Sequence, residues 1–182
     1  MSTASERAAL IARQGLGARY DAPEAPADDL LFARRGTAYF ARLLNGLPDD
    51  ALVDNRRAVV VARVGYHARG LTRLMTWART GVEQREHESA AARDAEDTFG
   101  ASLPARALRG LFDHAAIHLD VEWRDLPGPS WDTPLRLSDG TEITARDTPM
   151  IRARLIWRAA LELDAGGRLA DVPPDARPPS TL

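Results

Sequence analysis

Two side chains in one apolar stripe are the first candidates for chemistry in this sequence. His67 lies within the stripe and Arg63 precedes it by four residues, so both fall on one face of a helix. An unperturbed imidazole titrates near neutrality and can carry a proton, and a guanidinium can stabilise a developing anionic charge. The pair therefore predicts a polar site that faces the core. The alternative is a hydrogen-bonded core histidine beside an arginine that reaches the edge of the stripe.

The other three histidines give weaker indications of a site. His114 and His118 have the i, i+4 spacing of a two-histidine metal clamp. Both flank an apolar face, so one packing and one half-exposed histidine is the competing interpretation. A relocated metal site built from His67, His114 and His118 remains an alternative. His87 stands in the charged string Glu86-His-Glu and is expected on the surface.

Composition excludes several other chemistries. Cysteine is absent and all 24 basic residues are arginine, so cysteine nucleophiles, thiolate ligands and Schiff-base lysines are excluded. No nucleophile elbow, P-loop or dinucleotide fingerprint is present. A net charge of −2 argues against nucleic acid or a membrane surface as partner. The first residues do not resemble a signal peptide, and we expect a cytoplasmic protein.

The elements that must position these residues are mostly helices. We expect an N-terminal arm over 1–28, with a short helix over 6–13, a helical unit over 29–166, and a proline-rich tail over 167–182 that is disordered or lies on the surface. Apolar periodicity predicts further helices over about 29–47, 50–80, 104–126 and 148–164, and a short, highly charged helix is expected over 88–99. Asp139-Gly within 134–144 predicts a hairpin. The fold class is therefore all-α, a four-helix bundle with a short β-hairpin before its last helix.

Several strings in this sequence occur together in one known family. They are Ala33-Arg-Arg-Gly-Thr-Ala-Tyr-Phe-Ala-Arg, Val64-Gly-Tyr-His-Ala-Arg, Trp77-Ala-Arg-Thr-Gly-Val-Glu, Val121-Glu-Trp-Arg-Asp-Leu-Pro and Arg152-Ala-Arg. From about residue 13 to 166 the chain resembles the mycothiol-dependent maleylpyruvate isomerase family, whose members are DinB-like four-helix bundles. Larger members carry a second, C-terminal domain, and we expect this shorter chain to lack it.

The resemblance also implies where a metal would bind. Family members hold a divalent metal through one histidine on the second main helix and a glutamate and a histidine four residues apart on the last. The matching positions here are Arg63, Leu155 and Ala159, so the family's ligands are replaced and no metal is expected. The family's metal makes a low-molecular-weight thiol anionic, and such a thiol remains a candidate cofactor.

Two functions follow from these residues and the resemblance. The first is a metal-independent isomerase-like enzyme acting on a small anionic or carbonyl-bearing metabolite by isomerisation, cyclisation or another proton-transfer rearrangement. Arg63 would stabilise charge, His67 would carry the proton, and Tyr66 and Arg152 would bind substrate. The second is a non-catalytic small-molecule-binding or interaction protein on the same fold. A homo-oligomer is compatible with either function.

Overall fold

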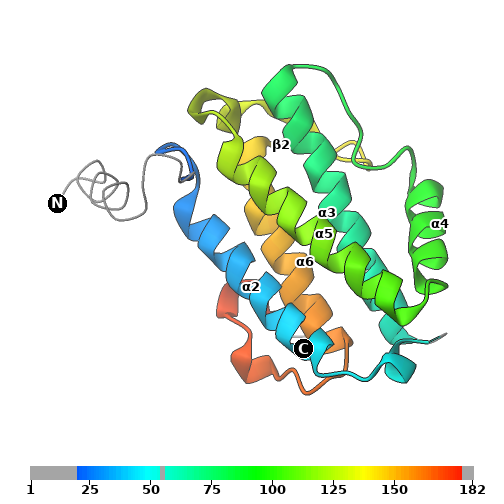
Figure 1. Ribbon diagram of the computed structural model, residues 1–182. Coiled ribbons are helices and arrows are strands. Elements are labelled where there is room, and N and C mark those ends of the chain that lie inside the picture. The colour runs from blue at the N-terminus through cyan, green and yellow to red at the C-terminus, as the bar shows by residue number, and fades with distance from the viewer. Residues whose placement is uncertain (1–19, 54–55, 178–182) are drawn as a thin grey trace, which may run out of the picture.

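The computed structural model describes residues 20–53 and 56–177, and most of these residues are helical (Figure 1). The predicted helix over 6–13 lies outside the described residues. The α-helices are α2 (Ala27–Asn45), α3 (Arg56–Thr80), α4 (Ala90–Ala101), α5 (Ala105–Asp125) and α6 (Thr148–Glu162). Two strands, β1 (Pro134–Arg136) and β2 (Glu142–Thr144), precede α6, and short 3-10 helices lie at Asp49–Leu52, Gly128–Asp132, Ala145–Asp147, Leu169–Asp171 and Pro174–Ala176.

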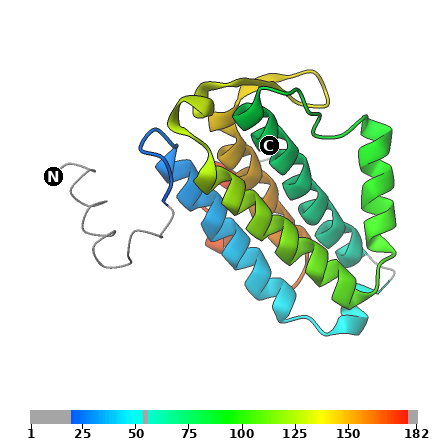
Figure 2. The same ribbon diagram turned by 45° about the horizontal axis from the view of Figure 1, so that its top comes forward.

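Four long helices form the bundle. Helix α2 packs on α6, α3 packs on α5, and α3 also contacts α6, while α4 lies outside this bundle against α3 (Figures 1 and 2). The apolar stripe predicted for α5 is buried as expected, at Leu108, Leu111, Phe112, Ala115 and Leu119. The predicted all-α fold class is therefore confirmed.

Helices α2 and α6 approach closely at a glycine. A Cβ placed on Gly36 would lie 2.7 Å from Ile156 Cγ2 and 2.8 Å from Trp157 Nε1, and both of these side chains are buried. No side chain larger than hydrogen fits there unless α6 moves. Gly36 therefore sets the distance between the two helices.

We expect Gly36→Ala to lower the free energy of unfolding by about 1–3 kcal/mol, the usual cost of overpacking a core. Gly110 on α5 is the matched control, because nothing lies within 4 Å of a Cβ placed on it. Gly110→Ala should raise stability by about 0.5–1 kcal/mol through helix propensity. Urea unfolding followed by circular dichroism measures both changes. Equal effects of the two substitutions would contradict the close packing at Gly36.

The hairpin is confirmed where Asp139-Gly predicts it. Leu135 pairs with Ile143 at the centre of the antiparallel strands. Gly140 has a positive φ of 87°, and the Asp139 carboxylate accepts a 2.9 Å hydrogen bond from the backbone N–H of Thr141. The Asp139-Gly turn thus has the left-handed conformation that its glycine favours.

One predicted helix boundary is wrong, and the described part of the tail takes the surface arrangement that was one of its two expected states. The helix expected over 50–80 is two elements, since Val53 is extended between the 3-10 helix Asp49–Leu52 and α3. In the described part of the tail, Val172 and Ala176 are buried, and Tyr39 donates a 2.8 Å hydrogen bond to Asp171. This part of the tail is therefore packed on the bundle, because its few apolar residues find a place beside α6.

None of the helices within residues 20–53 and 56–177 combines the length and the apolar character needed to cross a bilayer.

Candidate functional site

Arg63, His67 and Leu155 come together at a cavity of about 420 Å³ between α3 and α6. Their spacing explains this, because positions 63 and 67 share one face of α3 and that face meets α6. The remaining lining residues are Ile151, Arg154, Arg158 and Glu162. Three arginines against one glutamate give the cavity a positive balance of charge, which suits an anionic ligand.

The same three residues also line a second cavity, of about 350 Å³, on the side of α4. Its other lining residues are Glu86, His87, Arg93, Asp94 and Asp97. Arg63, His67 and Leu155 thus stand between an arginine-rich space and a carboxylate-rich space. We refer to the two cavities together as the Arg63 site.

The charge of Arg63 is already paired. Its Nη2 makes a short ion pair with Glu162 Oε2 from the last turn of α6. Both side chains keep contact with solvent, Arg63 at 37% and Glu162 at 29% exposure. Water therefore screens the pair, and an anion entering the cavity can compete with Glu162 for the guanidinium.

His67 is held in one tautomer by Arg152. Arg152 Nη1 lies 3.3 Å from His67 Nδ1 and donates a 2.8 Å hydrogen bond to the carbonyl of Val64. A guanidinium can only donate, so Nδ1 accepts and the ring proton of neutral His67 is on Nε2. Burial lowers the pKa of His67 well below its usual value, and the charge of Arg152 lowers it further. The expectation that His67 titrates near neutrality is therefore wrong, because the sequence showed neither how deeply the ring is buried nor that Arg152 contacts it.

The lowered pKa of His67 predicts acid sensitivity. Unfolded protein takes up a proton at this position below about pH 6.5, whereas folded protein does so only at lower pH. The titration of His67 therefore leaves the free energy of unfolding unchanged above that pH. Below it, the free energy of unfolding falls by up to about 1.4 kcal/mol per pH unit. His67→Asn keeps an acceptor for Arg152 but cannot titrate. Urea unfolding from pH 7.5 to 5 should show a smaller loss for the variant, and identical losses would refute the assignment.

His87 is not on the surface, which corrects the sequence interpretation. It is 5% exposed, and its Nδ1 lies 2.7 Å from Glu96 Oε2 on α4. The ring sits against α3 at Gly70, where a Cβ would lie 3.3 Å from His87 Nε2. Gly70 on α3 thus leaves space for the His87 ring, and Glu96 on α4 provides its hydrogen-bond partner. The charged neighbours of His87 in the sequence had instead indicated an exposed side chain.

Asp97 is a site residue that sequence reasoning missed. It projects from α4 into the second cavity, where its Oδ1 is buried and has no hydrogen-bond partner among the described residues. Burial raises the pKa of this carboxyl, and nearby Arg63 partly opposes the rise. The sequence feature that could have indicated Asp97 is its position one turn before Gly100, because α4 contacts α3 at Gly100.

The fold and the sequence relate this chain to a solved enzyme. The structure matches the crystal structure of the mycothiol-dependent maleylpyruvate isomerase with a TM-score of 0.79 and 30% identity over 82% of this chain. The chain is a relative of this isomerase. A histidine-to-alanine variant of the isomerase matches equally well. The chain spans 65% of the isomerase's length. No family model and no curated protein matches it.

The resemblance to the maleylpyruvate isomerase family aligns its metal ligands with Arg63, Leu155 and Ala159. In the structure, Arg63 and Leu155 line the Arg63 site, whereas Ala159 is fully buried and lines neither cavity. An arginine, a leucine and an alanine offer no donor set for a divalent metal. The residues at these positions therefore do not fit the isomerase family's metal.

Tyr66 and the α5 histidines are not part of the Arg63 site. Tyr66 packs on Gly100 of α4, with the Arg69 guanidinium 5.5 Å above its ring, and lines neither cavity. His114 and His118 are both exposed, so the expected packing histidine is not found. Within the described residues, no three His, Asp or Glu side chains are grouped to hold a metal, so the structure does not assemble the relocated His67, His114 and His118 centre.

Proposed function

We propose that this protein is a metal-independent enzyme similar to maleylpyruvate isomerase, acting in the cytoplasm on a small anionic or carbonyl-bearing metabolite at the Arg63 site. One observation carries the proposal: the residue aligned with a metal ligand of the isomerase family is a cation, and it opens onto two cavities beside His67. A guanidinium supplies positive charge where that family places a metal. It binds a carboxylate directly, which suits a keto-acid substrate.

Substrate binding rests on the arginine-rich cavity. Arg154 and Arg158 are exposed and line this cavity together with Arg63. A substrate carboxylate would take the place of Glu162 on Arg63, with the two outer arginines drawing it in. Ile151 and Leu155 supply apolar surface beside it. These contacts orient the carbonyl end of the substrate toward His67.

Proton transfer rests on the α4 side of the site. The Nε2–H of neutral His67 would donate a hydrogen bond to the carbonyl oxygen, as neutral histidines do toward developing enolates. Asp97, whose pKa is raised, would accept the proton from the adjacent carbon. The electron pair of the broken C–H bond forms a carbon–carbon double bond while the carbonyl π pair moves to the oxygen, and return of the proton to another carbon completes an isomerisation. A cyclisation would instead follow when the enolate carbon attacks a second carbonyl carbon of the same substrate, whose oxygen then takes the proton from Asp97. Every step uses side chains of this chain.

The role of a thiol is a separate question within this proposal. The related isomerase is named as mycothiol-dependent. A thiolate at this site would find its counter-charge in Arg63. We retain a low-molecular-weight thiol as a candidate cosubstrate, and the reaction above does not require it.

Maleylpyruvate is the first probe for this proposal. We expect the protein, purified and dialysed against EDTA, to hold less than stoichiometric divalent metal by elemental analysis. We further expect the rate at which it converts maleylpyruvate to be the same before and after EDTA treatment. Proton NMR follows this conversion, in one series with mycothiol and in another without it. The His67→Asn variant should lose rate more than affinity, since its role is in the transition state. Activity that EDTA removes and zinc restores would refute metal independence.

The non-catalytic alternative is supported by one specific contact. The ion pair between Arg63 and Glu162 already satisfies the cation. A binding protein needs no more than this exchangeable pair, whereas an enzyme also needs His67 and Asp97. Calorimetry separates the two functions: saturable binding of maleylpyruvate with no turnover under any of the above conditions would favour the binding protein.

A further inference from the structure

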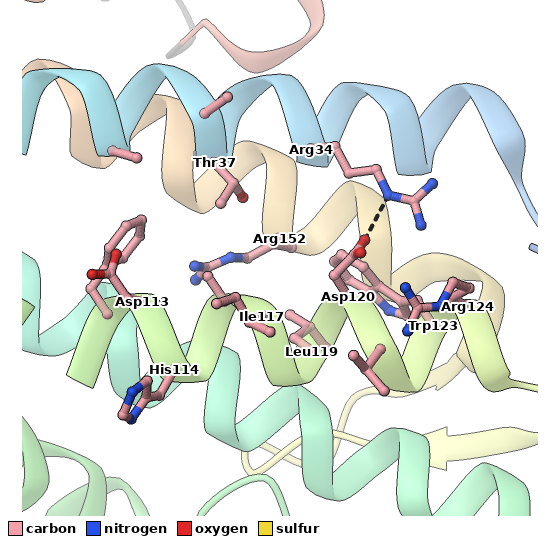
Figure 3. A pocket seen from close by; sticks show the side chains of 15 residues that line it. Arg34, Thr37, Asp113, His114, Ile117, Leu119, Asp120, Trp123, Arg124 and Arg152 are labelled. Carbon is pink, nitrogen blue, oxygen red and sulfur yellow. Dashed lines mark hydrogen bonds and ion pairs between the residues drawn. The ribbon is translucent and has the colours of Figure 1, made fainter. Parts of the chain in front are cut away.

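A separate groove runs between α2 and α5, across the bundle from the Arg63 site. Its volume is about 650 Å³, which is within the range of small-molecule sites. Its walls are mostly apolar and include Ala38, Ala41, Ala116, Ile117, Leu119 and Val121. Phe112 also lines the groove and packs against Phe40, with ring centroids 5.1 Å apart. Trp123 lines it near the ion pair of Arg34 and Asp120 (Figure 3).

The floor of this groove holds a buried cation. Arg152 is 1% exposed, and its guanidinium lies between α2 and α5 (Figure 3). Its Nη1 is used by Val64 and His67, but its Nη2 is buried and has no hydrogen-bond partner among the described residues. Burial lowers the pKa of Arg152 to about 9, so the side chain is still charged at neutral pH. A buried charge without a counter-ion is costly, and an anion would relieve that cost.

No carboxylate of the described chain fills this role. Arg34 donates a 2.7 Å hydrogen bond to Asp120 and also holds Asp21, so Asp120 is already paired. Asp113 lines the groove but is exposed at its rim. The ion pairs of the described residues do not include Arg152. The counter-ion that Arg152 lacks would therefore come from a ligand.

We propose that the α2–α5 groove binds a monocarboxylate with an apolar body, whose carboxylate accepts a hydrogen bond from Arg152 Nη2 and whose hydrocarbon lies along the alanine-lined walls. One guanidinium nitrogen without a partner can be satisfied by one carboxylate, and the apolar walls of the groove are suited to contact a hydrocarbon tail. This site is separate from the Arg63 site and does not depend on the reaction proposed there.

Octanoate is the probe, titrated by calorimetry into the full chain at pH 7. We expect saturable binding of one octanoate per chain. Octan-1-ol has the same tail without the charge and should bind about 10- to 100-fold more weakly, the usual worth of a hydrogen bond to a buried charged group. Octylammonium should not bind measurably. Equal binding of octanoate and octan-1-ol would overturn the role of Arg152.

Three variants locate the bound octanoate. Ala38→Phe fills the groove from an exposed position on α2 and should abolish binding, while Ala95→Phe, at an exposed position on α4, should leave it unchanged. Arg63→Met should also leave it unchanged, because Arg63 belongs to the other site. Unchanged binding in Ala38→Phe, or loss of binding in Arg63→Met, would overturn the proposed location.

Arg152→Met tests the head group directly. It should reduce octanoate affinity to that of octan-1-ol without weakening octan-1-ol. If this variant does not fold, the comparison of octanoate with octan-1-ol in the wild-type chain decides the same question. Preference for octanoate that persists in folded Arg152→Met would overturn the assignment.

Discussion

Replacing Arg63 with methionine is expected to reduce the conversion of maleylpyruvate by at least about 100-fold in kcat/KM, the usual cost of removing a charge-stabilising donor from an active site. Methionine is close in length but neutral. The fold should tolerate the change, because Arg63 and Glu162 are both partly exposed and their pair contributes less than about 1 kcal/mol. Steady-state rates and urea unfolding of the same preparations measure the two effects.

Arg35→Met is the matched control for this experiment. Arg35 is an exposed arginine of α2 that lines neither cavity of the Arg63 site, so its loss should leave both rate and stability unchanged. An Arg63→Met protein with the wild-type rate would remove Arg63 from the mechanism, and with it the main argument that this chain is an enzyme.

The triple variant Arg63→His, Leu155→Glu, Ala159→His is expected to bind one zinc ion per chain that survives dialysis. These changes restore the ligand types that the family resemblance implies, and positions 155 and 159 share one face of α6. The histidine at position 159 replaces a fully buried alanine, so we expect a loss of stability of about 1–3 kcal/mol in the absence of zinc. Zinc should then raise the melting temperature, because it binds only the folded chain.

Double variants provide the controls for zinc binding. Each of the three pairs of substitutions lacks one ligand and should bind zinc at least about 100-fold more weakly than the triple variant. A folded triple variant that binds zinc no better than the pairs would show that one of these positions does not face the others.

The helices and the hairpin were predictable because their signals are local. Apolar periodicity located the four long helices of the described chain, the charged segment before Gly100 indicated α4, and the Asp139-Gly turn located the hairpin. The resemblance brought Arg63 and Leu155 to one site, although they are far apart in the sequence. Both line the same cavities in the structure. Periodicity alone would not have paired these two residues.

The electrostatic environment of the site could not be predicted, because it depends on contacts between distant segments. His87 is buried only because Gly70 leaves space and Glu96 meets its ring. His67 is held neutral by its burial and then by the charge of Arg152, which lies 85 residues later. Arg152 was expected to bind substrate, but no pattern in the sequence indicated that one of its nitrogens would remain buried without a partner among the described residues.

The weak attachment of α4 determines how often the Arg63 site opens by local unfolding. Helix α4 packs mainly on α3, and of its residues only Gly100 is buried, while Phe99 is 62% exposed. Local opening of such a segment costs less free energy than unfolding of the whole bundle. The amide protons of α4 should therefore exchange with solvent before those of α3, α5 and α6. Each such opening would carry Asp97 away from His67 and leave the rest of the fold intact.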